Sequence, residues 1–169
     1  MNKKYVPFGV TAALVLLLDQ ATKIYIDASM PLHESVPVIP GFFSITHVRN
    51  PGAAFGFLAG ASPLFRNIFF VGVTVAAILL ILQYVRTSRA EERLLNLSLS
   101  LILSGAVGNL IDRIRFGEVI DFLDVYVGSH HWPAFNVADS AISVGAVILF
   151  VELIRRGRER DIGHRRQKP

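Results

Sequence analysis

Cysteine is absent from this chain of 169 residues, and its absence removes several kinds of chemistry. Disulfide bonds, thiolate metal sites and a cysteine nucleophile are all excluded within the chain. No serine stands in a recognisable nucleophile elbow either. Charge is sparse, at 18% of residues, whereas hydrophobic residues make up 52% and the mean hydropathy is +0.48. A soluble domain of this length seldom needs so much apolar surface, and the composition therefore favours a membrane protein.

Four apolar runs are each near the length of about 20 residues that crosses a bilayer. We expect them to be membrane-spanning helices at about 6–26, 64–85, 94–112 and 134–154. The first run carries Asp19 and Lys23 and has no small-residue cleavage site after it, so it does not resemble a signal peptide. The predicted fold class is an all-α integral membrane protein with four transmembrane helices and a small β-like outward-facing loop region. The whole chain, residues 1–169, is expected to form a single membrane domain.

The positive charges are unevenly divided between the two sides that these spans define. Of the 17 lysines and arginines, 12 lie on the side of the chain termini and five on the other side. Since basic residues are retained in the cytoplasm, both termini are predicted to be cytoplasmic, together with a basic tail at 155–169. The loops at 27–63 and 113–133 then face outward. Contact with anionic phospholipids explains the basic tail, and no nucleic acid is needed to explain it.

The first outward loop, 27–63, holds five prolines and cannot be one continuous helix. Its segment FFSITHV mixes aromatic and β-branched residues and is typical of a short strand, and the following NPG (Asn50–Gly52) predicts a turn. The next segment, GAAFGFLAG, is apolar. We expect a small sheet-like lid at the outer membrane boundary. In the third and fourth spans, small residues recur every four positions, which favours close packing of helices in a bundle.

The presence of polar residues inside the spans requires an explanation, because inserting a charged side chain at the bilayer centre costs roughly 2.5–3.5 kcal/mol of free energy. Three pairs are each spaced to lie on one helix face. These pairs are Asp19 with Lys23, Asn109 with Asp112, and Asn136 with Asp139. All three are predicted to lie in the outer third of the membrane, and the adjacent outward segments add Asn50 and Asp121. Polar residues used only for packing would scatter in depth, so their convergence indicates a site.

Carboxylates are the reactive groups that these polar residues bring to the predicted site. Two carboxylates in a low-dielectric site share one proton, because like charges there do not both ionise easily. One can act as a general base toward water while the other, protonated, polarises a carbonyl group, as in an aspartic protease. Depth leaves the partner of Asp139 open among Asp19, Asp112, Asp121 and Asp124. Asp19 and Asp112 have a simpler alternative, in which they only neutralise Lys23 or Arg113. All five histidines lie outside the spans, and we expect no metal and no cofactor.

Five segments, in order, resemble the characteristic blocks of bacterial lipoprotein signal peptidase, also called signal peptidase II. They are LDQATK (Leu18–Lys23), RNPGAAFGF (Arg49–Phe57), GNLIDR (Gly108–Arg113), GEVIDF (Gly117–Phe122) and FNVADS (Phe135–Ser140). Each block alone is weak evidence for the family, since residue pairs such as GN or DR are common in proteins. All five within four spans and a matching length are specific, and they cover nearly the whole chain between the termini.

The resemblance implies an intramembrane aspartic endopeptidase that removes signal peptides from prolipoproteins, cutting just before a cysteine that carries diacylglycerol. It implies Asp121 and Asp139 as the catalytic pair and the antibiotic globomycin as an inhibitor. The positions that would support the pair or contact substrate and inhibitor are Asp19, Lys23, Asn50, Gly52, Asn109, Asp112, Arg113, Asn136 and Ala138. The expected location is the bacterial inner membrane, with the active site toward the outer face. We expect a monomer.

The same residues are also consistent with two other classes of protein. Clustered intramembrane carboxylates with a lysine also suit a proton-coupled transporter or channel. Against it, the predicted polar residues stop at one depth, and the cytoplasmic halves of the spans, such as AAILLILQYV, offer no charged path. A structural scaffold is the third alternative, and it leaves the polar convergence unexplained.

Overall fold

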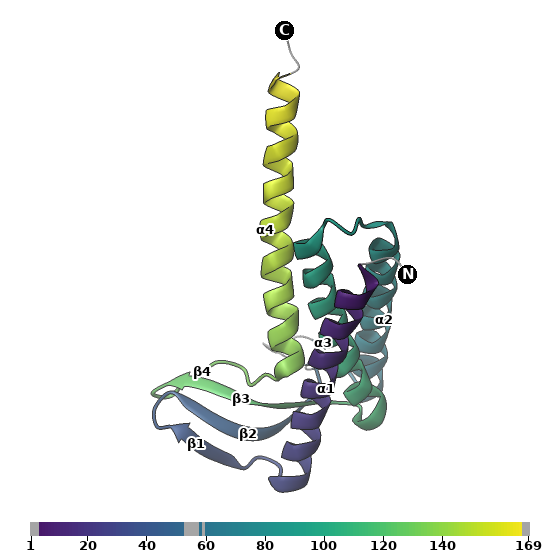
Figure 1. Cartoon of the computed structure of the whole chain (residues 1–169). Helices are drawn as coiled ribbons and strands as arrows, with labels where there is room; N and C mark the ends of the chain where they lie inside the picture. The colour runs from purple at the N-terminus through teal and green to yellow at the C-terminus, as the bar shows by residue number, and fades with distance from the viewer. Residues whose placement is uncertain (1–3, 53–57, 59, 167–169) are drawn as a thin grey trace.

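Long helices and a small antiparallel sheet make up the structure, a computed structural model that describes residues 4–52, 58 and 60–166 (Figure 1). The helices are α1 (Tyr5–Ser29), α2 (Pro63–Thr87), α3 (Arg93–Phe116) and α4 (Val137–Arg166). The strands are β1 (Ser35–Ile39), β2 (Phe43–Asn50), β3 (Val119–Val127) and β4 (His130–His131). Part of the predicted lid, residues 53–57 and 59, lies outside the described residues.

Four of these helices are long and apolar enough to cross a membrane, and the predicted fold class is confirmed. The ends of the helices differ from the predicted spans in ways that local chemistry explains. Helix α3 runs on to Phe116 and ends at Gly117, whose φ of 76° is the left-handed conformation that glycine adopts easily. Helix α4 begins three residues later than the predicted 134, because Asn136 caps it, and it continues through the predicted tail as far as Arg166.

Helix α3 is the centre of the bundle and contacts each of the other three helices. Its glycines permit these close approaches. A side chain at Gly105 would collide with the backbone carbonyl of Ala138 in α4, and one at Gly108 would collide with the carboxylate of Asp19 in α1. The predicted small-residue stripe is therefore buried, and it allows the helix backbones to approach closely where the polar residues meet.

The sheet has the strand order β1-β2-β3-β4, with every neighbouring pair antiparallel. Strand β2 contains the segment FFSITHV except its first residue, so the prediction of a strand there is confirmed. Strands β3 and β4 come from the second outward loop, which was not predicted to be extended. Pairing with β2 across some 70 residues of sequence stabilises β3, and no local pattern reveals such a partner. In this register Asp121 lies opposite Val48, and Asn50 lies opposite Val119.

The sheet lies at the end of the bundle away from both chain ends (Figure 1). A buried apolar cluster of Ile26, Ile120 and Phe122 joins the last turns of α1 to β3. The sheet is therefore fixed against the ends of the helices that carry the polar residues of the spans.

Candidate active site

A buried ion-pair cluster links α1 to α3. The ammonium of Lys23 lies 3.0 Å from a carboxylate oxygen of Asp19 and 2.9 Å from one of Asp112, and all three side chains are at most 1% exposed. The predicted pairing of Asp19 with Lys23 is confirmed. A cation between two anions offsets part of the desolvation penalty that each group carries. We call these three residues the Lys23 cluster.

Polar neighbours satisfy the remaining oxygens of the Lys23 cluster. Asp19 accepts a 2.8 Å hydrogen bond from the backbone N–H of Ala138, in the first turn of α4. The side-chain amide of Gln20 donates to Asp19 at 3.1 Å and to Asp112 at 3.2 Å. Sequence reasoning did not single out Gln20, although it stands inside the quoted block LDQATK. The cluster thus positions the start of α4.

A second pair of carboxylates, Asp121 on β3 and Asp139 on α4, is held by amides instead. Asn136 donates to Asp121 at 2.7 Å, and its own amide oxygen accepts the N–H of Asp139 at 2.9 Å. Asn50 donates to the other oxygen of Asp121 at 2.9 Å. Asn109 donates to Asp139 at 2.7 Å. Among the residues that the structure describes, neither aspartate is within ion-pair distance of a lysine, arginine or histidine.

Asn109 connects the two groups of acids. Its amide oxygen accepts hydrogen bonds from Lys23 at 3.0 Å and from Asn136 at 3.2 Å, while its N–H group faces Asp139. The two donors orient the amide so that its NH2 group points toward Asp139. Lys23 therefore helps to position the asparagine that donates a hydrogen bond to Asp139.

The electrostatic environment of Asp121 differs from that of an ordinary surface acid. Burial raises the pKa of Asp121 to about 7, and the neighbouring charge of Asp139 adds to the increase. The amides of Asn50 and Asn136 oppose it by stabilising the ionised form. A carboxyl group with a pKa near 7 beside a second carboxylate can hold a proton at neutral pH, so such a pair can provide both an acid and a base.

Asp124, another candidate partner of Asp139, has a different contact. Its carboxylate lies 2.9 Å from the Nδ1 atom of His131, on the neighbouring strand β4. The His131 ring also stacks on Tyr126, with ring centroids 4.6 Å apart. Asp124 therefore belongs to the outer part of the sheet. In the described ranges, no group of three or more histidine, aspartate or glutamate side chains could hold a metal ion.

An open groove of about 520 Å³ gives access to Asp139 from the side of α2 and α4. It is lined by Asn50, Gly52, Phe70, Arg113, Trp132, Pro133, Ala134, Phe135, Asp139, Ser140, Ser143 and Val144. Most of these residues are apolar, and the polar ones are Asn50, Arg113, Asp139, Ser140 and Ser143. The groove thus combines a surface suited to an apolar chain with a carboxylate at one place along it.

Two predicted residues shape the entrance to this groove. The guanidinium of Arg113 lies 5.3 Å from the ring centre of Phe70, a residue that sequence reasoning missed. The Gly52 N–H donates to the amide oxygen of Asn50 at 2.8 Å, so the predicted turn is confirmed. Gly52 has a φ of 90°, and any side chain there would collide with Phe70. This turn orients Asn50 toward Asp121.

Comparisons with known proteins agree with one another. The sequence model of a family described as Signal peptidase (SPase) II matches residues 11–155. A lipoprotein signal peptidase of Syntrophus aciditrophicus is 58% identical over 161 residues, which cover 95% of this chain and 100% of that protein. One of Geobacter metallireducens is 54% identical over 161 residues, covering 95% and 98%.

Two solved structures are similar as well, both described as bacterial membrane enzymes determined by the in meso method. The first, at 1.9 Å resolution, has a TM-score of 0.76 and 34% identity, covering 87% of this chain and 92% of the other. The second, at 2.3 Å resolution, has a TM-score of 0.79 and 32% identity, covering 96% and 93%. The similarity therefore extends from the sequence to the arrangement of helices and sheet.

Proposed function

Because this chain belongs to the signal peptidase II family, we propose that it removes signal peptides from bacterial prolipoproteins by aspartic catalysis, with Asp121 and Asp139 as the catalytic pair. The observation that carries the aspartic mechanism is the difference between the acids of the site. Asp19 and Asp112 form ion pairs with Lys23, whereas among the described residues Asp121 and Asp139 accept hydrogen bonds from neutral amides and form no ion pair. A carboxylate without an ion-pair partner is suited to general acid–base catalysis.

The proposed reaction is hydrolysis of a peptide bond by water. The ionised carboxylate of the pair takes a proton from water, and the resulting hydroxide attacks the carbonyl carbon of the scissile bond. The protonated carboxyl donates its proton to the carbonyl oxygen. Collapse of the tetrahedral intermediate breaks the C–N bond. The amine that leaves takes a proton from one carboxyl of the pair, and one hydroxyl of the intermediate returns its proton to the other as the carboxylic acid product forms. The pair ends with one shared proton, as it began, so no metal or cofactor enters the cycle.

The substrate fits the groove in chemical terms. A signal peptide is an apolar helix, and the cleavage site precedes a cysteine that carries two acyl chains. The apolar walls near Phe70 and Val144 suit such a chain, and Asp139 stands beside it. The acyl chains can stay in the surrounding lipid while the bond is cut. Globomycin, an apolar cyclic peptide, is proposed to occupy the same groove and to compete with substrate.

The experiment that tests this function uses purified protein in detergent. A synthetic prolipoprotein peptide should be cleaved just before its cysteine when that cysteine carries diacylglycerol. The same peptide without the lipid is the matched control, and it should be cut far more slowly. Globomycin should inhibit, and a metal chelator should not. Proton uptake into proteoliposomes without any peptide cleavage would instead support a transporter.

The orientation in the membrane is part of the proposal. We place both termini in the cytoplasm and the sheet at the outer face of the inner membrane, because the basic residues gather on the side of the termini. The chain has no cysteine, so single cysteines can report the side directly. Ser35→Cys should be labelled by a membrane-impermeant reagent from outside, and Thr87→Cys only after the membrane is opened. The reverse pattern would overturn the orientation.

A further inference from the structure

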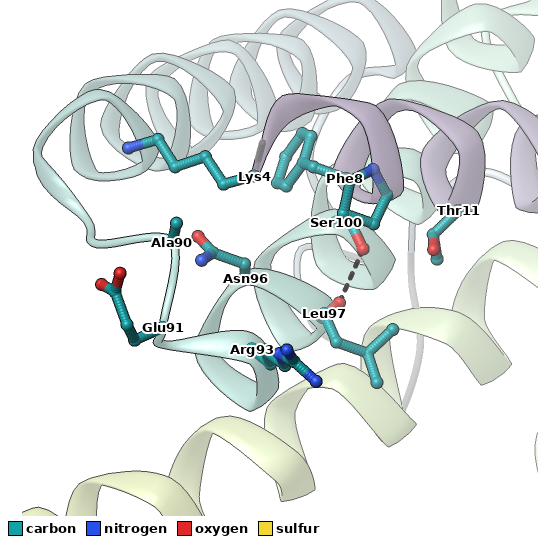
Figure 2. Close-up of a pocket in the computed structure, with 10 residues that line it drawn as sticks. Lys4, Phe8, Thr11, Ala90, Glu91, Arg93, Asn96, Leu97 and Ser100 are labelled. Carbon is teal, nitrogen blue, oxygen red and sulfur yellow. Dashed lines mark hydrogen bonds between the residues drawn. The ribbon is translucent and has the colours of Figure 1, made fainter. Parts of the chain in front are cut away.

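A second groove, of about 530 Å³, lies at the end of the bundle that carries the chain ends, far from the candidate active site. Figure 2 shows its lining residues, which come from the first turns of α1, the first turns of α3 and the connection between α2 and α3. Pro7 and Phe8 line it from α1, and Leu97 lines it from α3. It is open on one side, where Pro7 is exposed and Leu97 is 38% exposed.

The frame of this groove is fixed by buried polar contacts. The ammonium of Lys4 donates to the backbone carbonyl of Val85 at 2.6 Å and also to that of Ser88, where helix α2 ends. Asn96 donates to the carbonyl of Arg89 at 2.9 Å and accepts from the Ser88 hydroxyl at 2.8 Å. These groups are satisfied within the protein, so they hold the walls of the groove rather than a ligand.

Two charged side chains at the mouth of the groove do not form contacts of this kind within the protein. Glu91 and Arg93 line it, are exposed, and have opposite sign. Within the part of the chain that the structure describes, neither side chain forms a hydrogen bond or an ion pair. Figure 2 shows Glu91 at the loop end of the groove and Arg93 beside Leu97, with Thr11 further along it. A group that can bind a cation, a group that can bind an anion and a mostly apolar trough therefore follow one another.

Because α1 and α3 are long and apolar enough to cross a membrane, the open side of this groove faces lipid near the bilayer surface. We propose that the groove binds one phospholipid with a primary ammonium headgroup, from the leaflet on the side of the chain termini. The phosphate pairs with Arg93, the ammonium with Glu91, and one acyl chain lies along Phe8, Thr11 and Leu97. Charge complementarity selects this lipid, because both headgroup charges meet a partner.

Other phospholipids satisfy this groove less well. A choline headgroup carries its positive charge without an N–H group, so it cannot donate a hydrogen bond to Glu91. A glycerol headgroup has no cation at all, and its phosphate then lies near an unpaired carboxylate. Each of these lipids loses the charge-assisted hydrogen bond to Glu91, and we expect about tenfold weaker binding than for the ammonium lipid. This binding is independent of the proteolytic chemistry proposed above.

The test measures lipid binding to the full chain in detergent micelles. Phosphatidylethanolamine, phosphatidylcholine and phosphatidylglycerol with identical acyl chains are titrated separately. Bound lipid is counted by native mass spectrometry, and the unfolding midpoint is followed in parallel, because a ligand that binds only the folded protein raises it. One molecule of phosphatidylethanolamine should bind about tenfold more tightly than either of the others. Equal binding of all three lipids would mean annular lipid only and would overturn the proposal.

Variants locate the site. Glu91→Gln should remove the preference for phosphatidylethanolamine, and Arg93→Gln should weaken binding of all three lipids. Arg86→Gln is the matched control, because Arg86 is exposed at the end of α2 and does not line the groove. If Arg86→Gln weakens binding as much as Arg93→Gln does, general surface charge is the cause and the proposed site is wrong.

A steric test addresses the acyl chain. Thr11→Trp should fill the groove and abolish binding of the single lipid, whereas Leu14→Trp, at a position 64% exposed on the same helix, should not. If Thr11→Trp does not fold, the two charge variants still decide, since both change exposed residues. Retention of tight, selective binding in folded Thr11→Trp protein would contradict the proposal.

Discussion

The two acidic pairs at the sheet end of the bundle are similar in their residues and different in what surrounds them. Asp19 and Asp112 flank an ammonium, which compensates their charge inside the protein. Asp121 and Asp139 accept hydrogen bonds from asparagines, which stabilise a carboxylate without cancelling its charge. Burial alone does not distinguish Asp121, which is as buried as Asp112, whereas Asp139 is partly exposed to the groove. In the proposed function, the partner of each buried acid therefore separates the structural acids from the reactive ones.

The largest expected effect is on turnover by the amide-held pair. Asp139→Asn and Asp121→Asn should each keep the fold and lower the rate of peptide cleavage by about 10³-fold or more, because an amide is not a general base. The double variant should be about as inactive as either single variant, since the two carboxylates act as one unit. Cleavage of a lipidated peptide by protein shown to be folded is the measurement.

Two matched variants sharpen this prediction. Asp124→Asn removes a carboxylate from the same strand, but that carboxylate contacts His131, so activity should stay near that of the parent. Asp112→Asn is the competing assignment. Near-parent cleavage by Asp121→Asn together with inactive, folded Asp112→Asn would make Asp112 the partner of Asp139.

The next effect concerns stability of the Lys23 cluster. Asp19→Ala removes one carboxylate from a buried ammonium and leaves the Ala138 N–H without its acceptor, so it should destabilise the fold by about 3–5 kcal/mol. Asp19→Asn keeps an acceptor for that N–H group and should cost less. Unfolding in detergent measures both. If Asp19→Ala unfolds like the parent but is inactive while still binding globomycin, Asp19 acts in the chemistry instead.

The pH dependence of stability should distinguish Asp121 from the ion-paired acids. Its pKa rises from 3.8 to about 7 on folding, so between these values the folded protein holds a proton that the unfolded chain has released. Its contribution to stability is therefore present below about pH 4, falls by at most about 4 kcal/mol up to pH 7, and is constant above it. Asp121→Asn lacks this titration.

The difference in unfolding free energy between the parent and Asp121→Asn, measured from pH 4 to pH 8, checks this prediction. Asp121→Asn should gain stability relative to the parent as the pH rises through that window. A difference that does not change with pH would show that Asp121 titrates as an ordinary acid and would break the contrast between the two pairs.

The smallest effect on cleavage concerns Asn136, which caps α4 and also donates to Asp121. Asn136→Ala loses the hydrogen bond to the Asp139 N–H, worth about 1 kcal/mol for a cap alone, together with buried hydrogen bonds to Asn109 and Asp121, so it should destabilise the fold by more than the cap alone. It also removes a donor that lowers the pKa of Asp121, so the pH optimum of cleavage should move upward. Ser62→Ala is the matched control, because Ser62 caps α2 by accepting from Phe65. It should cost only the cap, about 1 kcal/mol of stability, and leave the pH optimum unchanged.

Some features were predictable because they depend on residues close together in the sequence. The four apolar runs predicted the helices, and the i, i+4 spacing predicted that Asp19 meets Lys23. The segment FFSITHV predicted β2, since a mixture of aromatic and β-branched residues favours a strand over a few residues. Strand β3 was missed although VIDFLDVYV has the same mixture of β-branched and aromatic residues, so its local pattern could have indicated a strand. The groove near Phe70 was missed because four separate segments line it.

The sequence by itself determined that a membrane bundle carries its polar residues at one depth, because helix length and side-chain spacing follow from local geometry and from the cost of burying charge. Only the tertiary structure decided which acid has which partner. Several carboxylates lie at the predicted depth of Lys23. Because Gly108 lets α1 and α3 pack closely, Lys23 forms its ion pairs with Asp19 and Asp112. The pairing of β2 with β3 places Asp121 beside Asn50 and Asn136 instead, because contacts between distant segments depend on how whole elements pack.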